Sequence, residues 1–157
     1  MKYDFLILGA DGMKGIIVTR DLLESGYSVF LADLYNTRLK AFLKKYPEKS
    51  FYTFADLRDI DMTINVITKS GADVVINCAE GDWNLNVYKA CVHTRTHVID
   101  LGSRFDDTKT QLEMDPLFKK IKKVAITGCG SVPGIGNVML RHAARKFDSL
   151  ETIDAGF

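Results

Sequence analysis

The sequence predicts an α/β fold of three layers, in which helices cover both faces of a doubly wound parallel sheet. Apolar runs of strand length alternate with amphipathic stretches of helix length along the whole chain, and this alternation is typical of such sheets. Two runs, 5–8 and 74–76, are continuously apolar, as expected of central strands that are buried on both faces. We therefore expect about six strands in the order 3-2-1-4-5-6.

Six strand–helix units follow one another along the chain. The first strand, 3–8, leads into a helix over 12–25 that stops at Gly26, and the second, 28–32, into a helix over 37–46 that stops at Pro47. The third strand, 50–54, precedes a helix over 60–70 that stops at Gly71. The remaining strands are predicted at 74–77, 97–101 and 124–127, and the helices after them at 83–93, 108–122 and 135–147.

Length and composition limit the classes of protein. The chain has 157 residues, 46% hydrophobic and 26% charged, which is typical of one globular domain. With 21 Lys and Arg against 20 Asp and Glu, the net charge of +1 argues against nucleic-acid binding. No apolar run is long enough for a membrane span, and the N-terminus does not open like a signal peptide. Three cysteines without a C-x-x-C pair fit a reducing compartment, so we expect a cytoplasmic protein.

The end of the chain predicts a boundary. We expect residues 1–150 to form one nucleotide-binding domain. Ile153, Ala155 and Phe157 alternate along 151–157, which predicts the start of a strand leading into a second domain that this chain does not contain. The alternative is a short edge strand that closes a complete domain.

A glycine-rich turn follows the first strand directly. It reads Gly9-Ala10-Asp11-Gly12-Met13-Lys14-Gly15, at the place where Rossmann domains bind the pyrophosphate of a dinucleotide. Glycines there allow a tight turn, close approach of the backbone and free N–H groups at a helix start. We expect the Met13 N–H to donate to a phosphate oxygen. The alternative is that the glycines serve only the turn.

Asp11 stands where the G-x-G-x-x-G fingerprint has its second glycine. A carboxylate about 4 Å from a phosphate would cost about 4 kcal/mol at an effective dielectric constant near 20. We therefore expect Asp11 to turn its side chain away from the phosphate, and capping the helix N-terminus would be one way.

An acidic residue at the end of the second strand predicts the cofactor. Asp33 follows Gly15 by 18 residues, where a carboxylate accepts from the adenosine ribose hydroxyls and repels a 2′-phosphate. Asp33 therefore favours NAD over NADP. Arg38 keeps NADP open, because it could reach a 2′-phosphate, although it also fits a solvated helix-face arginine. For Asp33 the alternative is a strand-end or N-cap aspartate.

Three later loops reach the same edge of the sheet. Asp56 follows the third strand and could accept from the adenine amino group, or it is simply a turn residue. Cys78 and Ala79 leave the fourth strand with small side chains, which would let the nicotinamide-ribose half lie against the backbone. Pro133 and Gly134 belong to a glycine-rich loop before the last helix, and we expect them to flank the nicotinamide.

Other chemistry is not supported by the sequence. No Tyr-x-x-x-Lys pair of short-chain dehydrogenases is present, and the glycine-rich loop over 127–137 lacks the lysine of a P-loop. His93 lies at the end of a predicted helix and His97 in the strand that follows. The two side chains should therefore not share a face, and a metal site there is not expected. Cys129 fits a small filler residue, and Trp83 fits a residue that packs in the core or at the rim of the crevice.

Four segments together resemble the nicotinamide-binding domain of saccharopine dehydrogenases and their relatives. They are the glycine turn at 9–15, the strands at 74–77 and 97–100, and the Pro-Gly loop at 130–137. The resemblance implies hydride transfer between NAD(P) and an amino-acid-like carbon–nitrogen bond. It also implies a second, mixed α/β domain that begins at about Glu151 and supplies much of the substrate site, so no catalytic residue is assigned here.

Two alternatives to that function stay open. The chain could be a stand-alone dinucleotide-binding module that senses redox state or regulates a partner, or a structural domain that binds no nucleotide. The sequence leaves the substrate, the direction of reaction and a homodimer open.

Overall fold

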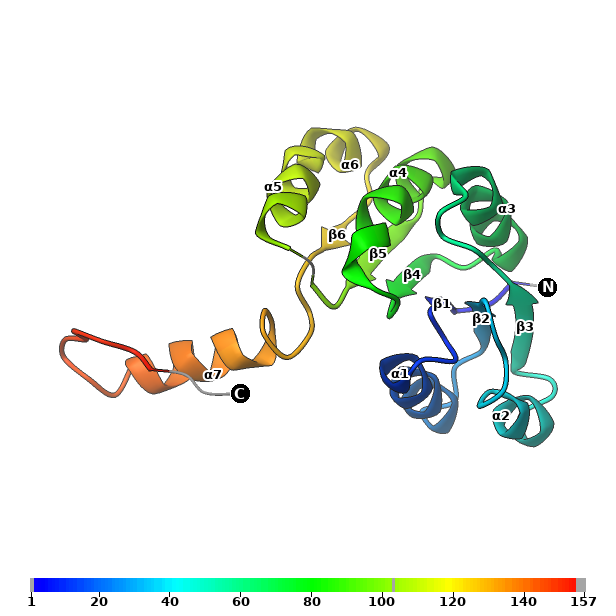
Figure 1. Cartoon of the computed structure of the whole chain (residues 1–157), viewed down its shortest axis with the longest axis horizontal. Coiled ribbons are helices and arrows are strands. Elements are labelled where there is room, and N and C mark those ends of the chain that lie inside the picture. The colour runs from blue at the N-terminus through cyan, green and yellow to red at the C-terminus, as the bar shows by residue number, and fades with distance from the viewer. Residues whose placement is uncertain (1, 103, 155–157) are drawn as a thin grey trace.

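The fold is a parallel sheet between two layers of helices (Figure 1). The computed structural model describes residues 2–102 and 104–154. Within them the strands are β1 Phe5–Leu8, β2 Val29–Asp33, β3 Ser50–Phe54, β4 Val74–Asn77, β5 His97–Asp100 and β6 Ala125–Ile126. The α-helices are α1 Met13–Glu24, α2 Lys40–Lys45, α3 Ile60–Ser70, α4 Asn84–Thr94, α5 Phe105–Glu113, α6 Asp115–Ile121 and α7 Ile135–Ala144, and a 3₁₀ turn, η1, spans Gly81–Trp83.

The sheet has the order β3-β2-β1-β4-β5-β6, and all its pairs are parallel. β1 lies between β2 and β4, with Leu6 opposite both Phe30 and Val75. Leu6, Ile7 and Leu8 are fully buried, because helices cover both faces of β1. The predicted fold class and strand order are confirmed.

Two apolar clusters fill the space between the sheet and the helical layer on each of its faces. One cluster joins Leu6, Leu8 and Val75 to the helices on the α3 and α4 side, where Tyr88 is the largest fully buried side chain. The other joins Ile7 and neighbouring strand residues to α1 and α2. Alternate residues of one strand therefore enter opposite layers, which fixes the register of the central strands.

The predicted helix over 108–122 is wrong in one respect, because the structure has two helices there. α5 ends at Glu113, and α6 begins at Asp115 with Pro116 in its first turn. Proline has no N–H to continue the preceding helix but fits a first helical turn, so it separates the two. The other elements begin and end within three residues of the predicted bounds.

Helix α7 leaves the body of the domain (Figure 1). It was predicted among the helices that cover the sheet, but none of its residues is buried. Residues 151–154 form no strand, and 155–157 lie outside the described residues, so the strand expected over 151–157 stays a prediction. None of the helices in 2–102 and 104–154 is both long and apolar enough to cross a membrane.

Candidate functional site

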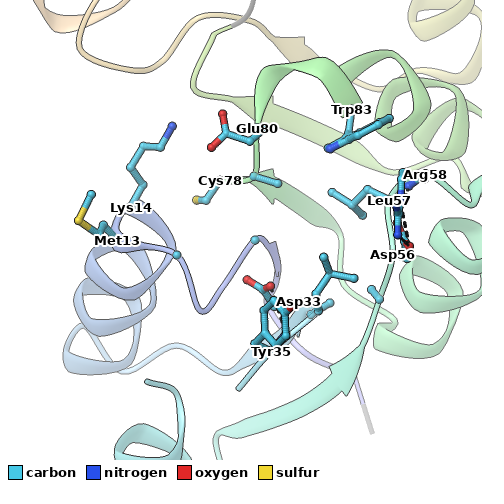
Figure 2. A pocket seen from close by; sticks show the side chains of 16 residues that line it. Met13, Lys14, Asp33, Tyr35, Asp56, Leu57, Arg58, Cys78, Glu80 and Trp83 are labelled. Atoms are coloured by element: carbon cyan, nitrogen blue, oxygen red, sulfur yellow. Dashed lines mark hydrogen bonds and ion pairs between the residues drawn. The ribbon is translucent and has the colours of Figure 1, made fainter. Parts of the chain in front are cut away.

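A crevice of about 710 Å³ opens at the carboxyl ends of β1, β2, β3 and β4 (Figure 2). Parallel strands present their carboxyl ends at one edge, and the strand order reverses between β1 and β4, which leaves room there for a ligand. Seven of the residues predicted for the cofactor line it, namely Gly9, Gly12, Met13, Asp33, Asp56, Cys78 and Ala79. The structure thus brings four separate turns of the chain together in one site.

The glycine turn packs closely against its own backbone and against the loop after β4. Gly9 has φ +68°, and a Cβ there would lie 2.5 Å from the Ala79 nitrogen. A Cβ on Gly15 would lie 2.1 Å from the Gly9 carbonyl oxygen, so both glycines allow close packing inside the turn. Gly12 caps α1 with an extended backbone and lines the crevice.

The N-terminus of α1 fits an anionic group. No side chain caps this helix, and its first turn contains no acidic residue. Gly12, Met13 and Lys14 of this turn all line the crevice. The first N–H groups and the positive end of the helix dipole therefore remain available to a phosphate.

Asp11 turns its side chain away from the crevice, as expected. Its Oδ1 accepts hydrogen bonds from the backbone N–H groups of Arg38 at 2.7 Å and Leu39 at 3.0 Å. The carboxylate therefore caps the residues that lead into α2, and the suggestion that it caps its own helix is wrong. The replacement of a fingerprint glycine by Asp11 ties the turn to the next strand–helix loop.

Ala10 and Gly15 form the buried back of the turn. Both are buried, and neither lines the crevice. Ala10 packs in the apolar cluster with Ile7 and Leu31, so the turn is anchored to the core from behind.

Asp33 is held in the crevice by backbone hydrogen bonds. Its Oδ2 accepts from the Asp11 N–H at 2.8 Å and its Oδ1 from the Tyr35 N–H at 3.4 Å. The Tyr52 hydroxyl donates to the Asp33 carbonyl oxygen at 3.0 Å, and burial, with Asp33 and Asp11 nearby, raises the pKa of Tyr52. Arg38 is exposed and does not line the crevice.

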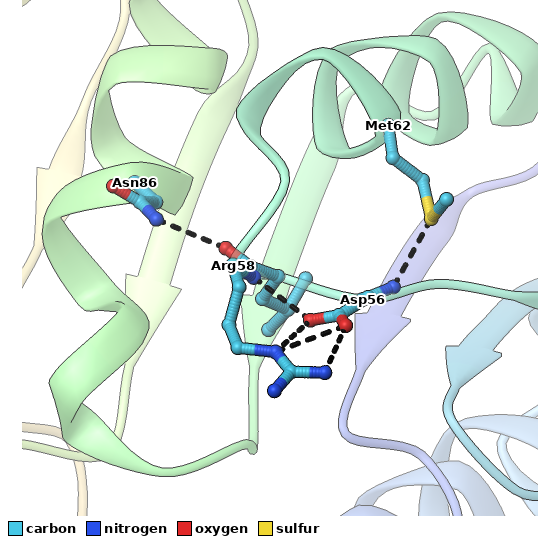
Figure 3. A network of polar contacts seen from close by, with 5 residues as sticks. Asp56, Arg58, Met62 and Asn86 are labelled. Atoms are coloured by element: carbon cyan, nitrogen blue, oxygen red, sulfur yellow. Dashed lines mark hydrogen bonds and ion pairs between the residues drawn. The ribbon is translucent and has the colours of Figure 1, made fainter.

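Asp56 forms an ion pair with Arg58 on the opposite rim, in which both carboxylate oxygens accept from the guanidinium (Figure 3). The Arg58 Nε donates to Oδ1 at 2.9 Å and to Oδ2 at 3.0 Å, and the Arg58 N–H donates to Oδ1 at 3.0 Å. These hydrogen bonds lower the pKa of Asp56. The Asp56 N–H donates to the Met62 sulfur, and Asn86 donates to the Leu57 carbonyl oxygen, so the rim is fixed on both sides.

Cys78 and Trp83 form the wall that follows β4. Cys78 is 4% exposed, and burial raises the pKa of its thiol to about 12, opposed by the Lys14 charge. Its N–H donates to the Leu8 carbonyl oxygen at 2.8 Å, which continues the pairing of β1 with β4. Trp83 lines the crevice beside Leu57 and Arg58 (Figure 2) and also packs against the core.

The structure does not bring Pro133 and Gly134 to this crevice. They line a separate hollow of about 480 Å³ together with Gly128 and other residues of the same loop. The loop begins beyond β6, at the same edge of the sheet as the crevice. Their role at the nicotinamide therefore stays a prediction.

Sequence reasoning missed several residues of the crevice. Lys14, Tyr35, Arg58 and Glu80 line it, and each lies within a few residues of a strand end or of the glycine turn. That position was the available signal. Trp83 was predicted as a core or rim residue, and it is both.

No group of three metal-binding side chains occurs in the part of the chain that the structure describes. The segment 91–97, which contains Cys91, His93 and His97, runs from the end of α4 into β5. Cys91 is buried in it, and the His97 Nδ1 accepts a hydrogen bond from the Val124 N–H at 3.0 Å.

Solved structures share this fold over much of the chain. Apo saccharopine dehydrogenase (L-Glu forming) from Saccharomyces cerevisiae has a TM-score of 0.73 at 21% identity, over 92% of this chain and 31% of that one. Pen from Bacillus thuringiensis has a TM-score of 0.56 at 16% identity over 76% of this chain and 45% of that one. The enzyme WbmG from Bordetella bronchiseptica, in complex with NAD and UDP, has 0.54 at 15% identity over 65% and 38%.

This chain spans about a third of the length of the yeast dehydrogenase that it matches. A search of curated protein sequences finds no match. Comparison with protein families matches residues 5–126 to the family described as the saccharopine dehydrogenase NADP binding domain. The matched range contains β1 to β6 and every turn of the crevice. The chain therefore belongs to the saccharopine dehydrogenase NADP-binding domain family, and it is an oxidoreductase cofactor-binding domain of that type.

Proposed function

We propose that the crevice binds NAD in preference to NADP and presents its nicotinamide for hydride transfer at an amino-acid-like carbon–nitrogen bond. The observation that carries the proposal is the pairing, in one crevice, of an uncapped helix N-terminus with the Asp33 carboxylate. The first fits a pyrophosphate and the second a ribose. When bound, the nicotinamide ring gives or takes the hydride.

Different residues of the crevice hold different parts of the dinucleotide. Gly9, Gly12 and Gly15 shape the pyrophosphate turn, and the Met13 N–H donates to a phosphate oxygen. Asp33 accepts from the adenosine ribose. These roles need no movement of the backbone, because Gly12 already exposes the helix start and Asp33 is already fixed by the Asp11 N–H.

Purine recognition is assigned to the rim after β3. Asp56 lines the crevice with Leu57 and Arg58, and a carboxylate oxygen keeps acceptor capacity beyond the bonds that Arg58 makes. It can therefore accept from the adenine amino group while it holds Arg58. Trp83, on the same side, offers a flat apolar surface to the purine.

The preference for NAD rests on charge. A 2′-phosphate would stand beside the Asp33 carboxylate, and the repulsion at about 4 Å is about 4 kcal/mol at an effective dielectric constant near 20. Arg38 does not line the crevice, and the Arg58 guanidinium is already paired with Asp56. Neither arginine therefore offsets the repulsion, even though the family is described as NADP binding.

Calorimetric titration of the chain with NAD and with NADP tests the preference. We expect NAD to bind at least tenfold more tightly, a difference of about 1.4 kcal/mol. Asp33→Asn should weaken NAD binding and bring the two affinities closer together, whereas Glu48→Gln, which removes an exposed acid outside the crevice, should change neither. Tighter binding of NADP by the unchanged chain would overturn the preference, and no heat with either dinucleotide at millimolar concentration would overturn the function.

The substrate and a second domain belong to the same proposal. We infer that residues 1–150 are the cofactor domain and that 151–157 lead into a domain that supplies much of the substrate site. The exposed apolar side chains of α7, Ile135, Val138 and Met139, support this, because they need a covering surface that the described residues do not provide. The three cysteines are free thiols, which supports a reducing, cytoplasmic compartment.

A further inference from the structure

Asp100 is a fully buried carboxylate at the end of β5, outside the crevice. Burying a charge costs free energy unless hydrogen bonds compensate it. Four donors surround this one. The Tyr88 hydroxyl and the Gln111 amide donate to Oδ2 at 2.6 and 2.8 Å, and the N–H groups of Gly102 and Gly128 donate to Oδ1 at 2.6 and 3.0 Å.

Each carboxylate oxygen holds a different part of the molecule. Oδ2 is bound by side chains of α4 and α5, which belong to the helical layer. Burial raises the pKa of the Tyr88 hydroxyl, so it remains a donor. Among the residues that the structure describes, Oδ1 accepts only from backbone N–H groups of the loops that follow β5 and β6. Asp100 therefore fastens two loops to the helical layer.

These two loops hold Pro133. A Cβ built on Gly102 would lie 3.0 Å from the Pro133 ring, and one built on Gly128 would lie 3.1 Å from it. Both glycines also have positive φ, +107° and +74°. The proline ring thus rests on two glycine backbones whose N–H groups are both bound to Asp100, and the Cys129 N–H donates to the Asp100 carbonyl oxygen at 2.8 Å.

A chain of buried amides connects the same point to the crevice. The Ala79 N–H, at the crevice wall, donates to the Asn77 Oδ1 at 3.2 Å, and the Asn77 Nδ2 donates to the Asn84 Oδ1 at 2.7 Å. The Asn84 Nδ2 donates to the Gly102 carbonyl oxygen at 3.3 Å. Gly102 is therefore held from one side by the crevice wall and from the other by Asp100.

We propose that Asp100 is a positioning residue for the nicotinamide half of the dinucleotide. It fixes Gly102 and Gly128, and through them the Pro133–Gly134 loop, at a constant place relative to the Ala79 wall. This inference rests on the proposed function, because it takes the dinucleotide to extend from the crevice towards that loop. The residue does not touch the ligand, and its effect is confined to the half that the loop borders.

Titration with NAD and with ADP-ribose tests the inference, because ADP-ribose lacks only the nicotinamide. Asp100→Asn puts an NH₂ group where donors now converge. We expect it to weaken NAD binding at least tenfold relative to ADP-ribose. Gly102→Ala gives a second test that keeps the carboxylate, since its Cβ would meet the Pro133 ring and should produce the same change in ratio.

Ser70→Ala is the matched control for a lost buried hydrogen bond. The Ser70 hydroxyl donates to the Ile67 carbonyl oxygen and accepts from the Ala72 N–H at the end of α3, away from the loop. This variant should lose thermal stability without changing the ratio of the two affinities. If both ligands weaken equally in Asp100→Asn and Gly102→Ala, or neither weakens, the positioning role is wrong. If Asp100→Asn does not fold, Gly102→Ala decides alone.

The same titration separates this inference from the proposed function. If the unchanged chain binds both ADP-ribose and NAD, and each variant changes the two affinities by the same factor, the dinucleotide site stands and only the role of Asp100 is wrong. An unchanged chain that binds neither ligand overturns both.

Discussion

Cys78 shows how the position of one side chain decides its chemistry. The thiol lines the crevice, yet it is buried at the end of β4, and burial raises its pKa to about 12. A thiolate is the reactive form of cysteine, so Cys78 stays almost fully protonated at pH 8. It is therefore better suited to closing the wall of the site than to acting as a nucleophile.

A thiol titration with Ellman's reagent at pH 8 checks this. We expect one fast-reacting thiol in the folded chain, that of Cys129, because it is exposed whereas Cys78 and Cys91 are buried with raised pKa values. Cys129→Ser should remove the fast phase, and unfolding in guanidinium chloride should then expose two thiols. A second fast thiol in the folded chain would contradict the expectation.

At the scale of an element, the β1–α1 turn contains one glycine that serves the stability of the fold and another that faces the ligand site. Gly15 faces the inside of the turn, where a Cβ would lie 2.1 Å from the Gly9 carbonyl oxygen. Gly12 faces the crevice, where a Cβ would meet only that oxygen, at 3.3 Å. Two glycines three positions apart therefore answer to different constraints.

The two alanine variants should differ accordingly. Gly15→Ala should lower the free energy of unfolding by about 3 kcal/mol or more, because backbone must move to admit the methyl group. Gly12→Ala should change it by less than about 1 kcal/mol and weaken NAD binding at least tenfold, because the methyl group faces the place of the pyrophosphate. Urea denaturation and calorimetry measure the two effects. Equal loss of stability in both variants would show that Gly12 serves the turn rather than the ligand.

The elements also show what sequence reasoning can reach. The strand order was predictable because the continuously apolar 5–8 and 74–76 mark the centre of a doubly wound sheet. The division of α5 from α6 was readable from Pro116 but was masked by the amphipathic pattern on both sides of it. For α7 the pattern predicted a helix with an apolar side, but a pattern does not say which surface covers that side.

The site was predicted less completely than the fold. Motif positions such as Gly9, Asp33 and Asp56 follow from spacing, and the structure brings them to one crevice. Tyr35 and Arg58 have no motif, and they enter the site because their loops bend over a shared sheet edge. The capping of residues before α2 by Asp11 depends on a contact 27 residues along the chain, which local spacing does not encode.

At the scale of the whole molecule, the described residues divide into a packed body and an extending helix. The body, from β1 to β6, contains both apolar clusters and the crevice. Beyond it, Ile135, Val138 and Met139 of α7 are 58%, 62% and 64% exposed. Val124 and Ile126 at the β6 edge are also exposed, so uncovered apolar side chains occur both on α7 and at the β6 edge of the sheet.

A chain that ends at Gly134 should therefore be nearly as stable as the full chain. Buried apolar area is the main source of folding free energy, and α7 buries no residue, so its removal should change the free energy of unfolding by less than about 1 kcal/mol. Removing β6 as well should cost several times more, since its backbone pairs with β5 and the partly buried Ala125 packs against the core. Urea denaturation of the three chains measures both differences.

Hydrogen exchange measures the stability of α7 locally. Isolated helices of ten residues are marginally stable in water, so the amides of α7 should exchange within the first seconds, and those of β1 should be the most protected. Slow exchange in α7, or a loss of several kcal/mol on its removal, would mean that the helix packs against the body in solution.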